Sequence, residues 1–138
     1  MLKGIDKILT GDILKILCDM GHGDEIVIAD ANYPGDTYAK RLVRLPGIDA
    51  VTVAKAVLSV IPLDTYTEPA LIMDLTDSDK AKNDPEPTIW NEFEGVCGTL
   101  KKLERYEFYE RSKNAYAVIQ TGEERTYGNL ILVKGVIV

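Results

Sequence analysis

Two short apolar runs, residues 25–29 and 70–75, constrain the fold of this chain more than any other feature. The second run shows no polar/apolar alternation, which is typical of a strand buried on both faces. Segments with helical spacing alternate with such runs, and this alternation indicates the α/β class. We therefore predict a single three-layer α/β/α domain over residues 1–138, with a mostly parallel mixed sheet. Helices are expected at about residues 10–20, 52–61, from Pro87 onward and at 106–114, and further strands at 116–120 and 130–133.

Three segments are predicted to be turns or loops. Residues 30–35 are rich in turn formers, and residues 43–49 contain a Pro-Gly turn. Residues 74–87 are polar throughout and form the longest stretch without a periodic pattern. Ligands of open α/β sheets collect in loops beyond the carboxyl ends of strands. Asp30 directly follows the first predicted strand and occupies such a position.

Charge and composition exclude several classes of function. The chain of 138 residues has a formal net charge of −6, so it lacks the basic surface that binds nucleic acid. Its longest nearly apolar run, residues 54–63, is far shorter than the ~20 residues of a membrane span. One histidine and two scattered cysteines do not make a zinc cluster, so no zinc site is expected. The first residues lack a signal-peptide pattern, which predicts a cytoplasmic protein.

The single histidine of the chain, His22, lies in a Gly-His-Gly-Asp-Glu sequence at residues 21–25. Histidine exchanges protons near neutral pH, because its unperturbed pKa is ~6.5. A lone histidine in a glycine turn beside carboxylates is therefore a candidate acid–base catalyst. A surface turn residue after a helix would give the same local pattern.

Two later segments carry side chains suited to a neutral ligand with many hydroxyl groups. The first begins at Arg105, and the second ends in Tyr127, Gly128 and Asn129. Arginine and asparagine offer directional hydrogen bonds, and tyrosine adds an aromatic face, which together suit a sugar. The alternative interpretation is a helix-surface pair in the first segment and a plain turn in the second.

These segments resemble the ribose pyranase/fucose mutarotase family of small sugar-utilisation proteins. The resemblance runs nearly end to end and includes residues 19–25, 30–31, 62–66, 108–111 and 121–129. Arg105 and the Tyr-Gly-Asn sequence at 127–129 are more similar to the L-fucose branch, because the ribose branch has histidine and Tyr-Ala-Asn there. Residues 39–55 depart from the fucose branch.

The resemblance implies an enzyme that interconverts the α and β anomers of a free monosaccharide, L-fucose above all, without metal or cofactor. It assigns acid–base catalysis to His22 and substrate contacts to Asp30, Arg105, Tyr127, Gly128 and Asn129. A D-ribose pyranase and a non-catalytic monosaccharide-binding protein are the alternatives.

One geometric difficulty accompanies this assignment. A strand advances ~3.3 Å per residue, so the predicted strand could separate His22 from Asp30 by ~15 Å. Either the glycine turn folds His22 back over the sheet, or the two residues serve one site from different subunits. The best-known members of the family are ring-shaped decamers, so the resemblance implies a ring-like homo-oligomer, a decamer, with a site near the subunit contact.

Overall fold

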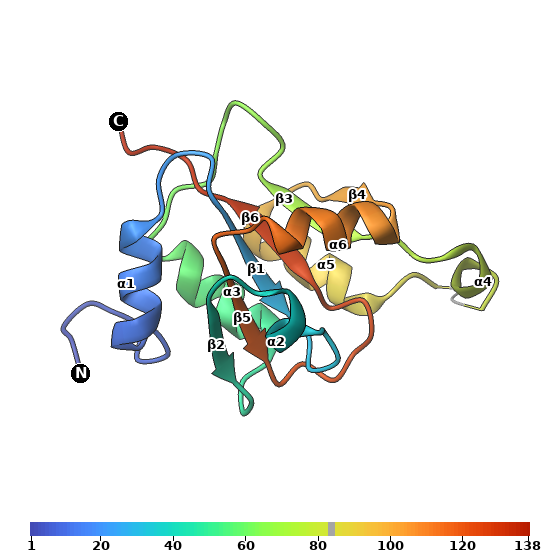
Figure 1. The fold of residues 1–138 in the computed structure, drawn as a ribbon, viewed down its shortest axis with the longest axis horizontal. Coiled ribbons are helices and arrows are strands. Elements are labelled where there is room, and N and C mark those ends of the chain that lie inside the picture. Colours follow the sequence, from blue (N-terminus) through green and yellow to red (C-terminus); the bar gives the residue numbers. More distant parts are fainter. Residues whose placement is uncertain (83–84) are drawn as a thin grey trace.

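The computed structural model describes residues 1–82 and 85–138. A six-stranded sheet with the order β2-β5-β1-β6-β3-β4 forms its centre (Figure 1). Three neighbouring strand pairs are parallel, and β6 runs antiparallel to both β1 and β3, so the predicted mostly parallel mixed sheet is confirmed. The strands are β1 (Glu25–Ala29), β2 (Leu42–Leu45), β3 (Ala70–Met73), β4 (Lys101–Leu103), β5 (Ala117–Thr121) and β6 (Leu130–Val133).

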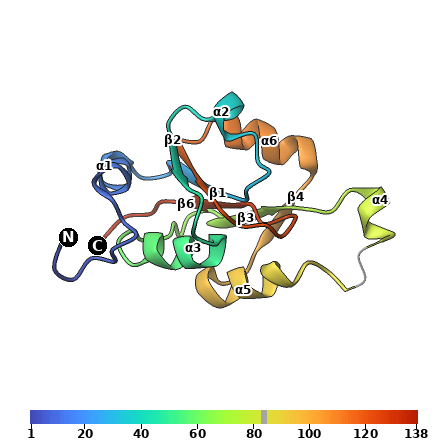
Figure 2. The ribbon, with the colours of Figure 1, turned by 90° about the horizontal axis from the view of Figure 1, so that it is seen from below.

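Helices cover both faces of the sheet and complete the three predicted layers (Figure 2). One face carries α3 (Ala50–Leu58) and α5 (Thr88–Cys97), and the other carries α2 (Gly35–Tyr38) and α6 (Arg105–Lys113). At one side of the sheet lies α1 (Gly11–Asp19), and α4 (Asp77–Lys80) projects at the other. Every helix within the described residues is too short or too polar to cross a bilayer.

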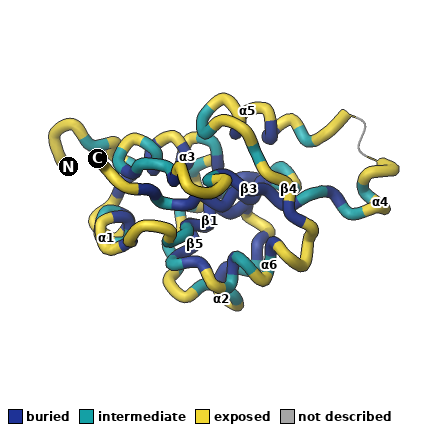
Figure 3. The backbone as a smooth tube through the Cα atoms, turned by 90° about the horizontal axis from the view of Figure 1, so that it is seen from above, coloured by how far each residue is buried: buried dark blue, intermediate teal, exposed yellow. Residues whose placement is uncertain are grey.

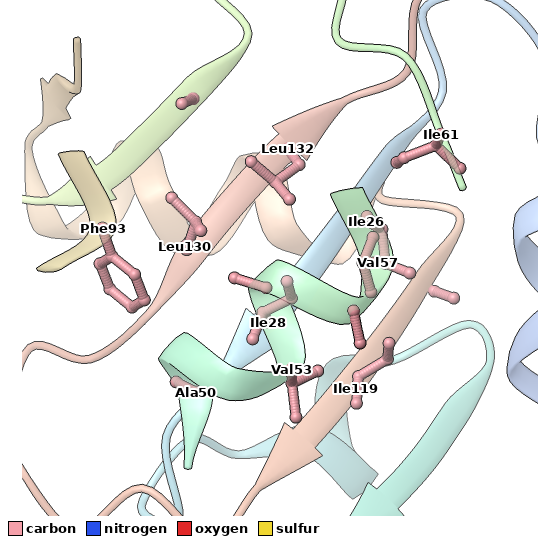
Figure 4. Packing of buried hydrophobic residues seen from close by; sticks show 14 of the residues in the cluster. Ile26, Ile28, Ala50, Val53, Val57, Ile61, Phe93, Ile119, Leu130 and Leu132 are labelled. Atoms are coloured by element: carbon pink, nitrogen blue, oxygen red, sulfur yellow. The ribbon is translucent and has the colours of Figure 1, made fainter. Parts of the chain in front are cut away.

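Alternate side chains of β1 enter two separate hydrophobic cores. Ile26 and Ile28 pack with α3 and α5 in the larger core, where Phe93 is fully buried (Figure 4). Val27 packs on the opposite face with Phe108 of α6 in the smaller core. Because successive strand residues point to opposite faces, a strand between two helical layers is apolar at every position. The buried centre of the sheet is continuous in Figure 3.

Side-chain caps define where α1 and α3 begin. Asp49 Oδ1 accepts a hydrogen bond from the backbone N–H of Thr52 at 2.9 Å and so caps α3. Thr10 caps α1 in the same way. The end of α1 is closed by Lys134, whose Nζ donates to the carbonyls of Leu17 and Met20 at 2.7 and 2.6 Å. This contact fixes the position of the turn that follows α1.

Four short elements depart from the sequence-based predictions. Residues 43–49 were expected to be a turn, yet β2 pairs with β5, and β4 pairs with β3. Both are edge strands with partly exposed residues, so their sequences lack the apolar pattern of the central strands. The four-residue helix α2 begins at the last residue of the predicted loop 30–35, and α4 lies within the predicted loop 74–87. Residues 83 and 84 of the second loop lie outside the described residues.

Candidate functional site

The strand directions bring four distant chain segments to one edge of the sheet. Because β6 runs antiparallel to both β1 and β3, the segments that follow β1, β3 and β4 lie beside the segment that precedes β6. The segments after β1, β3 and β4 begin at Asp30, Asp74 and Glu104, respectively. The segment before β6 ends at Asn129. This edge contains the carboxyl ends of the parallel strands, where ligands of α/β sheets bind.

A pocket of about 510 Å³ opens at this edge, a volume within the range of small-molecule sites. Four of the residues predicted to contact a sugar line it, namely Asp30, Arg105, Tyr127 and Asn129. Gly128 lies behind them, and its backbone N–H hydrogen-bonds the Asp30 carboxylate. The structure therefore brings all of the predicted sugar-contacting residues together. The remaining lining residues are Asn32, Tyr33, Met73, Thr76, Ser78, Asp79, Tyr109 and Thr126.

Asp30 and Asn129 form a reciprocal pair on the pocket floor. The Asp30 backbone N–H donates to Asn129 Oδ1 at 2.8 Å, and Asn129 Nδ2 donates to Asp30 Oδ2 at 3.1 Å. Asp30 Oδ1 also accepts a hydrogen bond from the Asn32 backbone N–H at 3.0 Å. Burial raises the pKa of the Asp30 carboxyl above its ordinary value, and hydrogen bonds from Asn32 and Gly128 oppose that shift. Asp30 is thus a fixed, buried carboxylate with increased affinity for a proton.

Arg105 begins α6 and places a positive charge at the pocket wall. Glu104 caps this helix by accepting hydrogen bonds from the backbone N–H groups of Tyr106 and Glu107. The Arg105 guanidinium lies 5.8 Å from the ring centroid of Tyr109, one helical turn later. The two side chains therefore present a cation and an aromatic surface to the same space.

Tyr127 is held at both its backbone and its hydroxyl. Its φ of 61° lies in the left-handed region, which non-glycine residues rarely adopt. Trp90 Nε1 donates to the Tyr127 carbonyl at 3.2 Å, and the two rings pack edge to face at 6.5 Å. Strained backbone of this kind persists where surrounding contacts fix it, and it is concentrated at functional sites.

His22 lies near the opposite edge of the sheet. Its Nε2 is 2.9 Å from Oδ1 of the buried Asp64, and its ring packs against Tyr66 at 5.3 Å. Asp64 also accepts hydrogen bonds from the backbone and the hydroxyl of Thr67. The Thr67 and His22 hydrogen bonds hold the pKa of the Asp64 carboxyl well below its ordinary value. His22 thus has a fixed ionised partner while 43% of its side chain stays exposed.

Within one chain, His22 does not reach the pocket. It precedes β1 and Asp30 follows β1, and the five residues of that strand span roughly 16 Å. His22 lines a separate apolar hollow that has no lining residue in common with the pocket. The glycine turn at residues 21–23 therefore does not fold His22 back over the sheet.

Several residues that line the pocket or contact His22 were not predicted as site residues. Asp79 lies in a segment predicted to be a loop on composition alone, and its contact with the pocket depends on tertiary packing. Tyr109 follows Arg105 by four residues, a spacing that places both on one helix face and could have identified it. Asp64 lies within a segment of family resemblance without an assigned role. Its signal was the Asp-x-x-Thr spacing to Thr67, typical of a side-chain-capped turn.

Comparisons with known proteins identify the family of this chain. The model of the RbsD / FucU transport protein family matches residues 3–137. This chain belongs to the RbsD / FucU family. Among RbsD / FucU relatives, the fucose mutarotase of Mus musculus is 49% identical over 144 residues, covering 97% of this chain and 94% of that protein.

Solved structures of RbsD / FucU proteins share the fold. The fucose mutarotase of Streptococcus pneumoniae in complex with L-fucose has a TM-score of 0.90 and 41% identity, and it covers 99% of this chain and 100% of its own. Bacillus subtilis RbsD complexed with D-ribose has a TM-score of 0.76 and 31% identity, with 100% of both chains covered. The first of these relatives was solved with L-fucose and the second with D-ribose.

Proposed function

We propose that this protein is a sugar mutarotase that interconverts the α and β anomers of free L-fucose. The observation that carries this proposal is the pocket at the carboxyl edge of the sheet, where a buried carboxylate, an amide, a guanidinium and a tyrosine converge. Such a set recognises hydroxyl groups by direction and packs an aromatic face on a sugar ring. The similarity to a fucose mutarotase bound to L-fucose supports the same ligand here.

The fucose branch is favoured over the ribose branch by both sequence and overall similarity. Arg105 lines the pocket where the ribose branch carries histidine, and Gly128 stands where it carries alanine. An alanine Cβ at position 128 would lie 3.0 Å from Glu123 Cγ and 3.1 Å from the Arg125 carbonyl, so this chain packs closely around its glycine. A D-ribose pyranase remains the alternative that the experiment below separates.

The reaction needs one proton donor and one proton acceptor. His22 would protonate the ring oxygen while the anomeric hydroxyl gives its proton to Asp30, directly or through water. The bond between C1 and the ring oxygen then breaks and C1 becomes an aldehyde carbon, which rotates and is attacked on its other face as both protons return. A positioned acid or base contributes ~10²–10⁴-fold, which suffices for a reaction that already proceeds in water.

The single-chain geometry leads us to propose that each site combines two copies of the chain. One copy would supply the pocket, and a second copy would supply His22. Exposed apolar residues near His22 support such a contact, because Tyr66 is 77% exposed and Ile137 is 85% exposed. Asp64 would orient the imidazole across this contact. By the family resemblance, we propose that the assembly is a ring-like homo-oligomer, a decamer.

The proposal also covers the cellular compartment in which the protein acts and the residues that form its domain. We place the reaction in the cytoplasm, and Cys18 and Cys97, both unpaired thiols, are consistent with a reducing compartment. Residues 1–138 would act as one mutarotase-like domain.

The test is magnetisation-exchange NMR on equilibrated anomers of L-fucose and, separately, of D-ribose. We expect faster exchange for L-fucose, and we expect His22→Ala to reduce the enzymatic rate ~10²–10⁴-fold because the proton donor is lost. Asp36→Asn is the control, since Asp36 is exposed and outside both the pocket and the His22 hollow. Acceleration for D-ribose alone would assign the pyranase activity instead. Binding of either sugar without acceleration would favour the sugar-binding alternative.

A further inference from the structure

The Tyr127 hydroxyl is enclosed by the turn that follows β3. The Thr76 backbone N–H points at Tyr127 Oη from 3.3 Å, and the Asp79 carboxylate hydrogen-bonds the same hydroxyl. Thr76 closes the turn by accepting a hydrogen bond from the Asp79 backbone N–H at 3.2 Å. The turn and the tyrosine come from residues about fifty positions apart, and together they form one wall of the pocket.

The direction of each hydrogen bond follows from the chemistry of the groups. A backbone N–H can only donate, so Tyr127 Oη accepts from Thr76. The Tyr127 hydrogen bond and a second one from Thr76 hold the pKa of Asp79 below its ordinary value, so this carboxyl is ionised at neutral pH. An ionised carboxylate can only accept. The phenolic proton of Tyr127 is therefore directed to Asp79, and the remaining capacity of Oη is that of an acceptor.

Neighbouring charges maintain the direction of the hydrogen bond from Tyr127 to Asp79. Lys82 Nζ lies 3.8 Å from Asp79 Oδ1, and the positive charge of Arg105 also lowers the pKa of Asp79. Burial and the Asp79 carboxylate both raise the pKa of the Tyr127 phenol. Tyr127 is thus neutral at working pH, with its proton directed to Asp79 in the pocket wall.

We propose that Asp79 is a positioning residue for the mutarotase site, which holds the Tyr127 hydroxyl so that its oxygen faces the sugar as a hydrogen-bond acceptor. This inference rests on the proposed function, since it assumes that Tyr127 contacts the sugar. For recognition, it follows that the sugar must present a hydroxyl hydrogen to Tyr127. It also follows that Tyr127 does not act as the proton donor of the reaction.

A double-mutant cycle tests whether Asp79 acts through Tyr127. The variants are Asp79→Asn, Tyr127→Phe and their combination, and Asp77→Asn is the matched control from the same turn, where Asp77 is exposed. Loss of a hydrogen bond to a charged group costs about tenfold or more, so we expect Asp79→Asn to lower kcat/KM for L-fucose by about tenfold. In the Tyr127→Phe background the same change should cost less than about twofold. An equal loss in both backgrounds, or no loss in either, overturns the proposal.

An ultraviolet difference titration of phenolate formation gives a readout independent of catalysis. Subtracting the Tyr127→Phe curve from the wild-type curve isolates Tyr127. We expect Asp79→Asn to lower the pKa of Tyr127, because the variant removes a neighbouring negative charge, and Asp77→Asn to leave it unchanged. An unchanged Tyr127 pKa in Asp79→Asn would overturn the pairing even if the enzyme is active. A lowered pKa in a protein that does not accelerate anomer exchange would instead preserve the pairing and refute the proposed function.

Discussion

At the level of single residues, Asp30 and Asp64 show how surroundings give one side chain opposite properties. Burial on the pocket floor raises the pKa of Asp30, whereas hydrogen bonds from Thr67 and His22 lower that of Asp64. The first carboxylate is suited to accept a proton, and the second is suited to stay ionised beside an imidazole. The two aspartates thus have distinct chemical roles at opposite edges of the sheet.

The lowered pKa of Asp64 predicts a specific dependence of stability on pH. An acid whose pKa is lower in the folded state stabilises the fold above its unfolded pKa of ~3.9, and this contribution is lost as the pH falls through the folded pKa. Asp64→Asn does not titrate, so its unfolding free energy should fall less than that of the wild type between pH 5 and pH 2. Urea unfolding at a series of pH values measures this difference. Parallel curves for wild type and variant would contradict the prediction, and Asp36→Asn serves as an exposed control.

The family resemblance was sufficient to group the residues predicted to contact a sugar, but it did not place His22. Asp30 follows β1 and Asn129 precedes β6, so the two lie together only because β6 runs antiparallel to β1, a direction that the apolar pattern of the sequence does not reveal. The contacts of Asp79 with Tyr127 and of Asp64 with His22 could not be predicted, because the partners lie more than forty positions apart in the sequence. Such pairings are set by tertiary packing, and local composition carries little information about them.

At the level of elements, the loop at residues 122–129 determines the shape of the pocket. It begins where Gly122 lies directly against the turn at Pro46 and Gly47, and its N–H donates to the Ile48 carbonyl at 2.8 Å. Buried Glu123 then accepts hydrogen bonds from the first residue of α3 and from Arg125. The loop is thereby attached to the β2–α3 connection and to the start of α3.

The close approach at Gly122 predicts a large effect of one methyl group. A Cβ at Gly122 would lie 2.0 Å from the Pro46 carbonyl oxygen, a backbone atom that cannot move aside cheaply. We expect Gly122→Ala to lower the unfolding free energy by ~1–3 kcal/mol or more. Gly47→Ala is the matched control from the other side of this contact, since no described atom lies within 4 Å of its Cβ. Chemical denaturation distinguishes the two, and equal stabilities would refute this account of the contact.

Elements were predictable where burial imposes a strong pattern. The central strands β1, β3, β5 and β6 are apolar at nearly every position, and each was expected close to its observed bounds. The edge strands β2 and β4 were not, because their half-exposed or lysine-rich sequences resemble loops. They adopt strand structure because β5 and β3 offer unpaired backbone groups.

At the level of the whole molecule, β1 separates the two halves of the proposed site. His22 precedes its amino end and Asp30 follows its carboxyl end. In the proposed two-chain arrangement, each chain would donate His22 to one site and supply the pocket of another. A closed ring of identical contacts satisfies both requirements for every copy.

This arrangement predicts complementation between inactive variants. His22→Ala chains and Arg105→Ala chains should each be inactive, and unfolding and refolding them together in equal amounts should restore about one quarter of the sites, since each contribution is intact in about half of the chains. Anomer exchange by NMR measures the recovery. The matched control pairs His22→Ala with the double variant, which assembles in the same way but cannot rebuild a site. No recovery in co-assembled material would mean that each site is made by one chain.

The attachments of the pocket loop have a consequence for motion. Arg125 bonds Glu92 of α5, Trp90 of α5 holds the Tyr127 carbonyl, and Glu123 holds the start of α3. These hydrogen bonds couple the motion of the loop to that of the layer formed by α3 and α5, although the sequence of the loop is typical of a surface turn. Its amides should exchange with heavy water on the timescale on which that layer opens, far more slowly than an ordinary loop. The pocket would then keep its shape until a whole helical layer loosens.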